Sequence, residues 1–205
     1  MLKFTVKKKG KDDRVLVLGI PRGGVIVADI VARKLNADFD IVIPRKISAP
    51  DNKENAIGAV MDDGSLYLDD FLVDSLKVSP EYIQRETKEQ LQEIERRKAL
   101  FRPTFREYNI KDRTVVLIDD GIATGATVIA AARWIRRRHQ PRQLIIAAPV
   151  AQPQAADLLK IKGEADIVEI ISTPSNFGSV NQFYQSFDQV TDERVMEILK
   201  NRNML

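Results

Sequence analysis

Two adjacent carboxylates and a glycine- and threonine-rich stretch are the residues of this chain best suited to chemistry. Asp119 and Asp120 directly follow the apolar run Val115–Ile118, and Ala123–Thr127 comes just after them. Successive N–H groups at a helix N-terminus, with two threonine hydroxyls, can surround a phosphate. The carboxylates would repel that phosphate, but they accept hydrogen bonds from hydroxyls or from the water shell of Mg²⁺. A phosphate beside a diol describes a ribose 5-phosphate, so the pattern predicts a site for that group.

A second candidate anion site follows the apolar run Val15–Gly19. The sequence there is Pro-Arg-Gly-Gly, with Arg22 ahead of Gly23 and Gly24. Glycine N–H groups that open a helix favour an anion, and the arginine adds a planar fork of donors that suits phosphate. The alternative interpretation is a tight turn with no ligand.

A basic pair, Arg45 and Lys46, follows a third apolar run at Phe39–Pro44. At the carboxyl end of a strand, a bound diphosphate would offset the charge of this pair. A solvated basic pair is the alternative. Together with the residues around Arg22, the pair predicts that a pyrophosphate binds on one side of the site and a ribose phosphate on the other.

These groups need a framework, and apolar runs that alternate with helical patterns predict one. The expected strands are Val15–Gly19, Phe39–Pro44, Thr114–Ile118, Gln143–Val150 and Ile167–Ile171. The expected helices are Val25–Leu35, Ala126–Arg138, Gln154–Lys160 and Glu193–Lys200. Fully apolar strands joined by helices indicate an α/β fold, a mostly parallel twisted sheet with helices on both faces. Ligands of such sheets bind beyond the carboxyl ends of the strands.

One stretch interrupts the alternation. An Asp-Asp-Gly turn between Ala56–Met61 and Ser65–Leu68 predicts a hairpin, and Ser79–Phe101 reads as a long polar helix with a serine cap and a proline at its first position. Its apolar stripe is narrow, which favours a surface helix or contact with a second copy; we expect a homodimer. The chain is therefore expected to be a single domain, 1–205, with a hairpin and long-helix insertion at about 48–104.

The segment Val115–Thr127 resembles the motif with which type I phosphoribosyltransferases bind 5-phosphoribosyl 1-pyrophosphate (PRPP). The resemblance implies that Asp119 and Asp120 contact the ribose hydroxyls and that the loop holds the 5-phosphate with Ala123, Thr124, Gly125, Ala126 and Thr127. Pro21–Gly24 falls where that family has its pyrophosphate loop. The pair Arg45 and Lys46 resembles the basic pair of the adenine and orotate enzymes.

Other segments resemble a group of predicted phosphoribosyltransferases whose substrate is unsettled. They are Asn55–Val60, the charged helix ending in Arg96-Arg97, and the stretches Phe177-Gly178 through Phe183-Tyr184 and Phe187 through Asp192. The core motif is specific for the fold and much less specific for the acceptor.

The resemblance implies an enzyme that transfers ribose 5-phosphate from Mg²⁺-bound PRPP to a nitrogen acceptor, a nucleobase-like ring, with release of pyrophosphate. The implied catalytic residues are Asp119, Asp120, Arg45 and Glu54; the pyrophosphate would be bound by Arg22, Gly23, Gly24, Arg45 and Lys46, and no side chain would ligate the metal directly. The hypoxanthine and guanine enzymes carry an acid where this chain has Ala123, so a reaction of that type is disfavoured. If a carboxylate assists, Asp51 and Glu54 in the loop after Lys46 are candidates, Glu54 first.

Two clusters leave alternatives open. Phe177 and Tyr184, with Phe183 and Phe187, could stack on a flat acceptor or simply pack the C-terminal segment onto the core. A cluster of basic residues gathers near the end of the expected helix Ala126–Arg138, and we interpret it first as a solvated surface and second as a contact for nucleic acid. Its members are Arg133, Arg136, Arg137, Arg138 and Arg142. That cluster is the support for an alternative function, a regulatory protein that senses PRPP or a nucleotide. A phosphohydrolase using the same loop is a third hypothesis.

Composition excludes several classes of protein. Apolar residues make up 44% and charged residues 30% of 205 residues, which is typical of a chain that buries a core. The sequence contains no cysteine and a single histidine, which excludes disulfides, thiolate nucleophiles and Cys/His zinc sites. No apolar run has the length of a membrane span, and a net charge of +3 is small for a nucleic-acid binder. We expect a cytoplasmic protein with no membrane partner.

Overall fold

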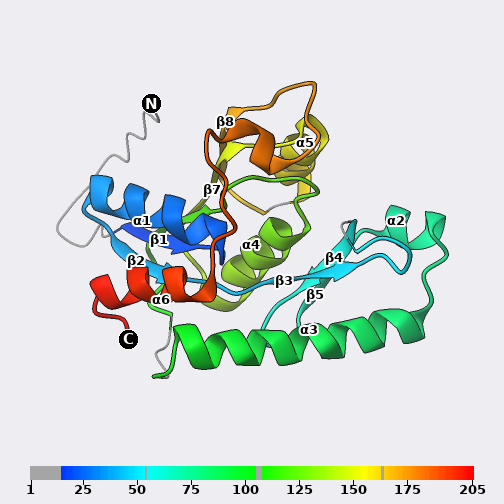
Figure 1. The fold of residues 1–205 in the computed structure, drawn as a ribbon, viewed down its shortest axis with the longest axis horizontal. Coiled ribbons are helices and arrows are strands. Elements are labelled where there is room, and N and C mark those ends of the chain that lie inside the picture. The colour runs from blue at the N-terminus through cyan, green and yellow to red at the C-terminus, as the bar shows by residue number, and fades with distance from the viewer. Residues whose placement is uncertain (1–14, 54, 105–107, 163) are drawn as a thin grey trace.

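Among the residues that the structure describes, the central sheet has five parallel strands in the order β2-β1-β6-β7-β8. The structure is a computed structural model, and it describes residues 15–53, 55–104, 108–162 and 164–205. The strands of this sheet are β1 (Val15–Gly19), β2 (Asp38–Ile41), β6 (Thr114–Ile118), β7 (Gln143–Val150) and β8 (Ile167–Ser172). The expected parallel α/β sheet is confirmed (Figure 1).

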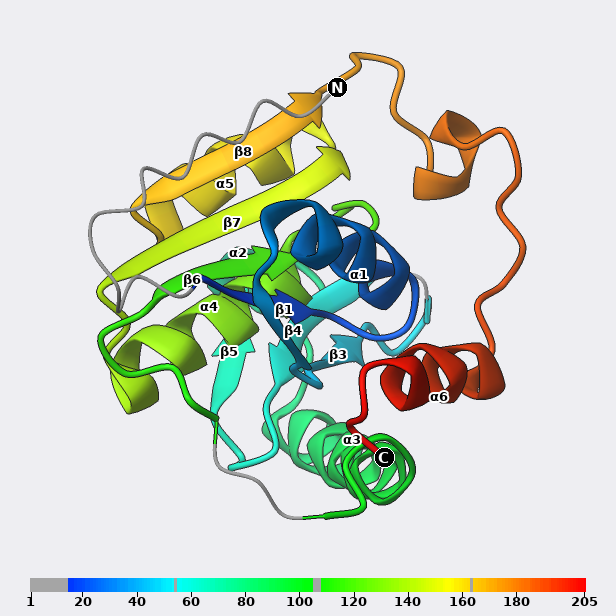
Figure 2. The same cartoon turned by 90° about the vertical axis from the view of Figure 1, so that its left-hand side faces the viewer.

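Helices cover both faces of this sheet because its inner strands are apolar on both sides. In β1, Val15 and Val17 pack with α1 (Gly23–Leu35), whereas Leu16 and Leu18 pack on the opposite side. That opposite face is covered by helices α4 (Ala126–His139) and α5 (Pro153–Lys162) (Figure 2). Alternate side chains of a strand point to opposite faces, so a fully buried strand needs a layer on each side.

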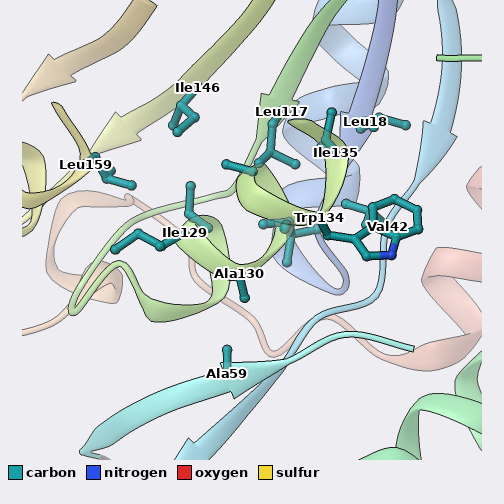
Figure 3. Packing of buried hydrophobic residues seen from close by; sticks show 14 of the residues in the cluster. Leu18, Val42, Ala59, Leu117, Ile129, Ala130, Trp134, Ile135, Ile146 and Leu159 are labelled. Atoms are coloured by element: carbon teal, nitrogen blue, oxygen red, sulfur yellow. The ribbon is translucent and has the colours of Figure 1, made fainter. Parts of the chain in front are cut away.

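A second sheet, antiparallel and three-stranded, lies between β2 and β6 in the chain. Its strands are β3 (Arg45–Ser48), β4 (Ala56–Val60) and β5 (Leu66–Leu68). The expected hairpin is confirmed as β4 and β5, and Gly64 in its turn has φ +81°, a conformation that suits glycine. Figure 3 shows Ala130 on α4 close to Ala59 on β4. Helix α4 is therefore packed between the two sheets.

Two of the expected boundaries were wrong. The strand expected at Phe39–Pro44 ends at Ile41, and Arg45 and Lys46 begin β3 of the second sheet instead of ending a strand of the first. A loop was expected to follow Lys46, and Arg45–Ser48 has only one large apolar residue to indicate a strand. The partner of β3 is β4, and this pairing determines its conformation.

The long helix α3 (Pro80–Phe101) lies along the second sheet and beside α6 (Asp192–Asn201) (Figure 1). The Ser79 hydroxyl accepts a hydrogen bond from the Tyr82 N–H and caps the helix, as expected. Ile94 and Phe101 are fully buried in one apolar cluster with residues of β3, β4 and α6. The narrow stripe is thus covered within the chain, so it no longer supports the expected dimer; the dimer itself stays a prediction.

Two shorter elements complete the structure. Helix α2 (Asp70–Ser75) follows β5, and a 3₁₀ turn, η1 (Val180–Phe183), lies in the segment that leads from β8 to α6. Within the described residues, no helix is both long enough and apolar enough to cross a membrane.

Candidate functional site

The carboxyl ends of β1 and β6 lie side by side at the point where the strand order of the main sheet reverses. The chain leaves β1 toward β2 on one side, and leaves β6 toward β7 on the other. Crevices at such a point are where open α/β sheets bind ligands. The N–H of Ile20, just after β1, donates to the carbonyl oxygen of Ile118 at 2.9 Å, which holds the two strand ends together.

A pocket of about 300 Å³ opens at this point and brings most of the predicted groups together. Two other pockets, near Arg113 and near Trp134, are smaller, at about 180 and 90 Å³. The predicted site residues that line the large pocket are Arg22, Gly23, Arg45, Lys46, Asp119, Asp120 and Thr127. They come from three separate parts of the chain.

The acid pair and the Pro-Arg-Gly-Gly turn touch each other. A Cβ atom added to Gly23 would lie 1.8 Å from Oδ2 of Asp120, and one added to Gly24 would lie 2.8 Å from the carbonyl oxygen of Ile118. Both contacts are closer than any side chain allows, so both glycines are required for this approach. The peptide bond between Pro21 and Arg22 is cis.

Asp119 lines the pocket and makes two hydrogen bonds with the backbone. Its Oδ1 accepts the N–H of Asp120 at 2.9 Å, and its own N–H donates to the carbonyl oxygen of Ala147 at 3.4 Å. Burial raises the pKa of the Asp119 carboxyl well above its usual range, and the neighbouring Asp120 charge adds to this effect. A ligand that donates hydrogen bonds to this carboxylate would favour its charged form.

The predicted phosphate loop forms the N-terminus of α4. Gly125 precedes the helix with φ +82°, and the Thr124 hydroxyl accepts the Ala126 N–H at 3.4 Å. The first N–H groups of a helix have no carbonyl partner within it, so this end can hold an anion. Ala123 and Thr124 are exposed, and Thr127 lines the pocket.

The basic residues of the pocket are held by α3 and α6. The Arg45 Nε donates to Oε1 of Gln90 at 3.0 Å, and Nη1 of Arg22 lies 3.5 Å from Oδ1 of Asp192. Burial lowers the pKa of Arg45, and the positive charge of Arg97 lowers it further. Bringing anionic phosphates to the pocket would relieve this concentration of positive charge.

The carboxylates expected in the loop after Lys46 receive little support. Asp51 is exposed and is not among the described residues that line the pocket, and Glu54 lies outside the described residues. The assignment of Glu54 as a catalytic residue stays a prediction.

The C-terminal segment contributes four residues to the pocket lining, and three of them were not singled out from the sequence. They are Phe187, which belongs to the expected aromatic cluster, and Asp188, Gln189 and Val190. The last three are exposed or half-exposed residues of an irregular segment, and their only signal was the resemblance of the stretch from Phe187 to Asp192.

The two predicted acceptor-binding residues lie just outside this lining. Phe177 stacks on Phe183 with ring centroids 5.4 Å apart. The Tyr184 hydroxyl donates to the backbone carbonyl of Asp120 at 2.5 Å, and its ring lies 5.1 Å from that of Phe187. Tyr184 therefore fastens the C-terminal segment to the acid pair.

The arginines at the end of α4 are paired with protein groups. Arg136 lies 2.6 Å from Asp166, Arg137 lies 2.7 Å from Glu164, and Arg138 lies 2.9 Å from Asp63. Arg142 donates to the Thr114 hydroxyl at 2.9 Å. This cluster was the sequence support for nucleic-acid contact, and its pairing favours the structural interpretation.

Comparisons with known proteins identify the family. Two curated proteins of Mycobacterium tuberculosis (strains CDC 1551 and H37Rv), each named "Putative phosphoribosyl transferase", are 36% identical to this chain over 185 residues. The match covers 90% of this chain and 41% of each relative, so the chain spans about two fifths of their length. The crystal structure of TT1426 from Thermus thermophilus is 39% identical, with a TM-score of 0.72 over 92% of this chain and 88% of that one.

The family model of the phosphoribosyl transferase domain matches residues 2–187, which include the strand ends, the acid pair and the phosphate loop described above. The chain belongs to the phosphoribosyl transferase domain family.

Proposed function

We propose that this protein is a phosphoribosyltransferase that transfers ribose 5-phosphate from PRPP to a nitrogen acceptor. The observation that carries the proposal is the pocket in which the Arg22 turn, the basic pair and the acid pair meet. Its cationic side suits a pyrophosphate, and its acidic side suits the hydroxyls of a ribose.

The pyrophosphate would be held by Arg22, Arg45 and Lys46, with the N–H groups at Gly23 and Gly24. These groups also stabilise the charge that builds up on pyrophosphate as its bond to the anomeric carbon breaks. Because Arg45 is held by Gln90, its guanidinium needs little reorganisation when that charge develops.

The ribose would be held by Asp119 and Asp120, and its 5-phosphate by the loop from Ala123 to Thr127. The transition state of glycosyl transfer has oxocarbenium character, so its sugar carries partial positive charge. Carboxylates near that sugar stabilise it, and the phosphate serves as a remote handle that fixes the position of the sugar.

Magnesium fits this pocket as a companion of the substrate. No group of three or more ligating side chains that could hold a metal lies within the described residues. Mg²⁺ bound with substrate phosphates keeps several of its waters, and Asp119 and Asp120 would accept hydrogen bonds from those waters without ligating the ion directly. When bound, the ion neutralises part of the charge on the pyrophosphate.

The acceptor would approach from the C-terminal segment. Phe187 offers an aromatic face, and Asp188 and Gln189 offer hydrogen-bonding groups at the pocket wall. A planar nitrogen heterocycle suits such a wall.

We also propose that the protein acts in the cytoplasm and forms a homodimer. Light scattering would test the dimer.

The test is release of pyrophosphate from PRPP and Mg²⁺ in the presence of a panel of nitrogen heterocycles. We expect release that depends on one acceptor and falls at least about a hundredfold in Asp119→Asn, since an oriented charged group at the reacting sugar is lost. The control is Asp157→Asn on α5, where the carboxylate pairs with Lys160 at the surface. Release without any acceptor would indicate hydrolysis, and full activity in Asp119→Asn would contradict the proposal.

A further inference from the structure

A chain of charged side chains runs from α3 to the pocket. Arg96 on α3 makes two hydrogen bonds to Glu93, at 2.7 and 2.9 Å, and a third to Oδ2 of Asp192 at 2.9 Å. The other oxygen of Asp192, Oδ1, lies 3.5 Å from Nη1 of Arg22. Arg22 lines the pocket, whereas Asp192 is not among the described residues that do. Asp192 therefore contacts Arg22 without lining the pocket itself.

The oxygen that faces Arg22 is poorly satisfied. Oδ1 of Asp192 is buried and makes no hydrogen bond with any described residue, and the side chain is only 18% exposed. A buried carboxylate oxygen without a donor is costly, so it favours a guanidinium held close to it. The Arg22 side chain is 29% exposed and retains N–H groups that can turn toward the pocket.

Asp192 itself is held firmly in place. It is the first residue of α6, which the Thr191 hydroxyl caps by accepting the Arg194 N–H at 3.3 Å. Val195, Ile198 and Leu199 bury the same helix in the cluster shared with α3. A carboxylate fixed from two sides can orient a flexible arginine, because an arginine fork binds one anion on each edge.

We propose that Asp192 is a positioning residue for the pyrophosphate site, which holds one edge of the Arg22 guanidinium so that the other edge faces the pyrophosphate. The inference rests on the proposed function. The negative charge of Asp192 is already shared between Arg96 and Arg22. Its repulsion of the pyrophosphate is therefore small beside the orientation that it gives to Arg22.

The test is a double-mutant cycle on the affinity for magnesium pyrophosphate, measured by calorimetry. We expect Asp192→Asn to weaken binding by about tenfold, as when one hydrogen bond to a charged group is no longer held in place. In an Arg22→Gln background the same change should have less than about a twofold effect, because the residue through which Asp192 acts is absent. Asp192→Glu retains a carboxylate and should recover most of the lost affinity.

The matched control is Glu197→Gln, which removes a carboxylate from the same helix, where its partner is the surface residue Arg194. Control and wild type should bind equally. An equal loss from Asp192→Asn in both backgrounds would overturn the inference, because Asp192 would then act through α6 or Arg96. No loss in the wild-type background would also overturn it. A wild-type protein that does not bind magnesium pyrophosphate would instead contradict the proposed function, and the inference with it.

Discussion

Tyr184 illustrates how one residue links the two sides of the pocket. Its hydroxyl donates to the backbone of Asp120, and the residues that follow it, Phe187 to Val190, form the opposite wall. From the sequence, its ring was expected to contact an acceptor. The geometry gives its hydroxyl a different role, which is to anchor the C-terminal segment to the acid pair.

This anchor makes a pH-dependent prediction. Burial raises the pKa of Tyr184 from 10.0 to about 12, and the negative charges of Asp120 and Asp119 add to the effect. Below pH 10 the hydroxyl is protonated in both states, so the stabilisation is fully present; it is lost as the pH rises toward 12, because the unfolded chain releases the proton first. Tyr184→Phe should be about 0.5–1.5 kcal/mol less stable in urea at neutral pH.

The difference between wild type and Tyr184→Phe should shrink as the pH rises from about 10 to 12. No difference at neutral pH would show that the hydroxyl does not make this bond, and a difference that stays constant with pH would show that its pKa is not raised. The ring remains in the variant, so stacking of an acceptor on it would be unaffected.

At the residue scale, the sequence predicted which residues would meet, but not which residues hold them. Asp119, Asp120 and Arg22 come shortly after the ends of β6 and β1, and the ends of parallel strands meet at one edge, so their place in one pocket could be predicted. Asp192 and Gln90 were not, because their roles depend on helices that pack from distant parts of the chain. Phe177 was expected to contact the acceptor because it is aromatic. In the structure its ring stacks on that of Phe183.

Among the helices and strands, α3 has the largest effect on the geometry of the site. It supplies Gln90 to Arg45 and Arg96 to Asp192, so its docking determines the geometry of the cationic side of the pocket. The docking is apolar, and Phe101 and Ile94 are its fully buried residues.

We therefore expect Phe101→Ala to lower the free energy of unfolding by about 3–5 kcal/mol, since it leaves a cavity in the cluster shared with β3 and α6. Urea unfolding measures this, with the exposed Glu89→Ala on the same helix as the control, expected to change it by less than about 0.5 kcal/mol. The loss should not depend on protein concentration, because the cavity lies within one chain. A concentration-dependent loss would mean that a second copy covers this helix.

Strand β3 and helix α2 were not predicted from the sequence. Strand β3 has the sequence Arg-Lys-Ile-Ser and is defined by pairing with β4, a contact that no local pattern reveals. Helix α2 buries no residue. By contrast, β1, β6 and β7 were predicted to the residue, because each is a continuous apolar run of the length of a strand.

For the whole molecule, the fold has two parts that meet at the pocket. The parallel sheet supplies the acid pair and the phosphate loop, and the second sheet with α3 and α6 supplies or holds Arg45, Lys46 and Arg22. The family model spans both sheets and α3, and the most specific sequence motif, Val115–Thr127, lies in the first part. The part of the pocket lining proposed to meet the acceptor comes from the irregular C-terminal segment, whose sequence pattern does not identify an acceptor.

The measurement that tests this account most directly is thermal unfolding with and without Mg²⁺ and PRPP. A ligand at about 100 times its dissociation constant adds roughly 2.7 kcal/mol. For a domain of this size that is a rise in Tm of about 5–11 °C. Asp119→Asn provides the control, because it removes a carboxylate of the proposed ribose site. Burial and the charge of Asp120 raise the pKa of that carboxyl.

Without ligand, Asp119→Asn should unfold at a higher temperature than wild type, since the variant has no carboxylate charge to bury at neutral pH. It should show no rise with PRPP. A magnesium-dependent rise in wild type alone is the result that the account predicts. A folded wild-type protein that shows no rise, or an equal rise in Asp119→Asn, would contradict the assignment of this pocket to PRPP.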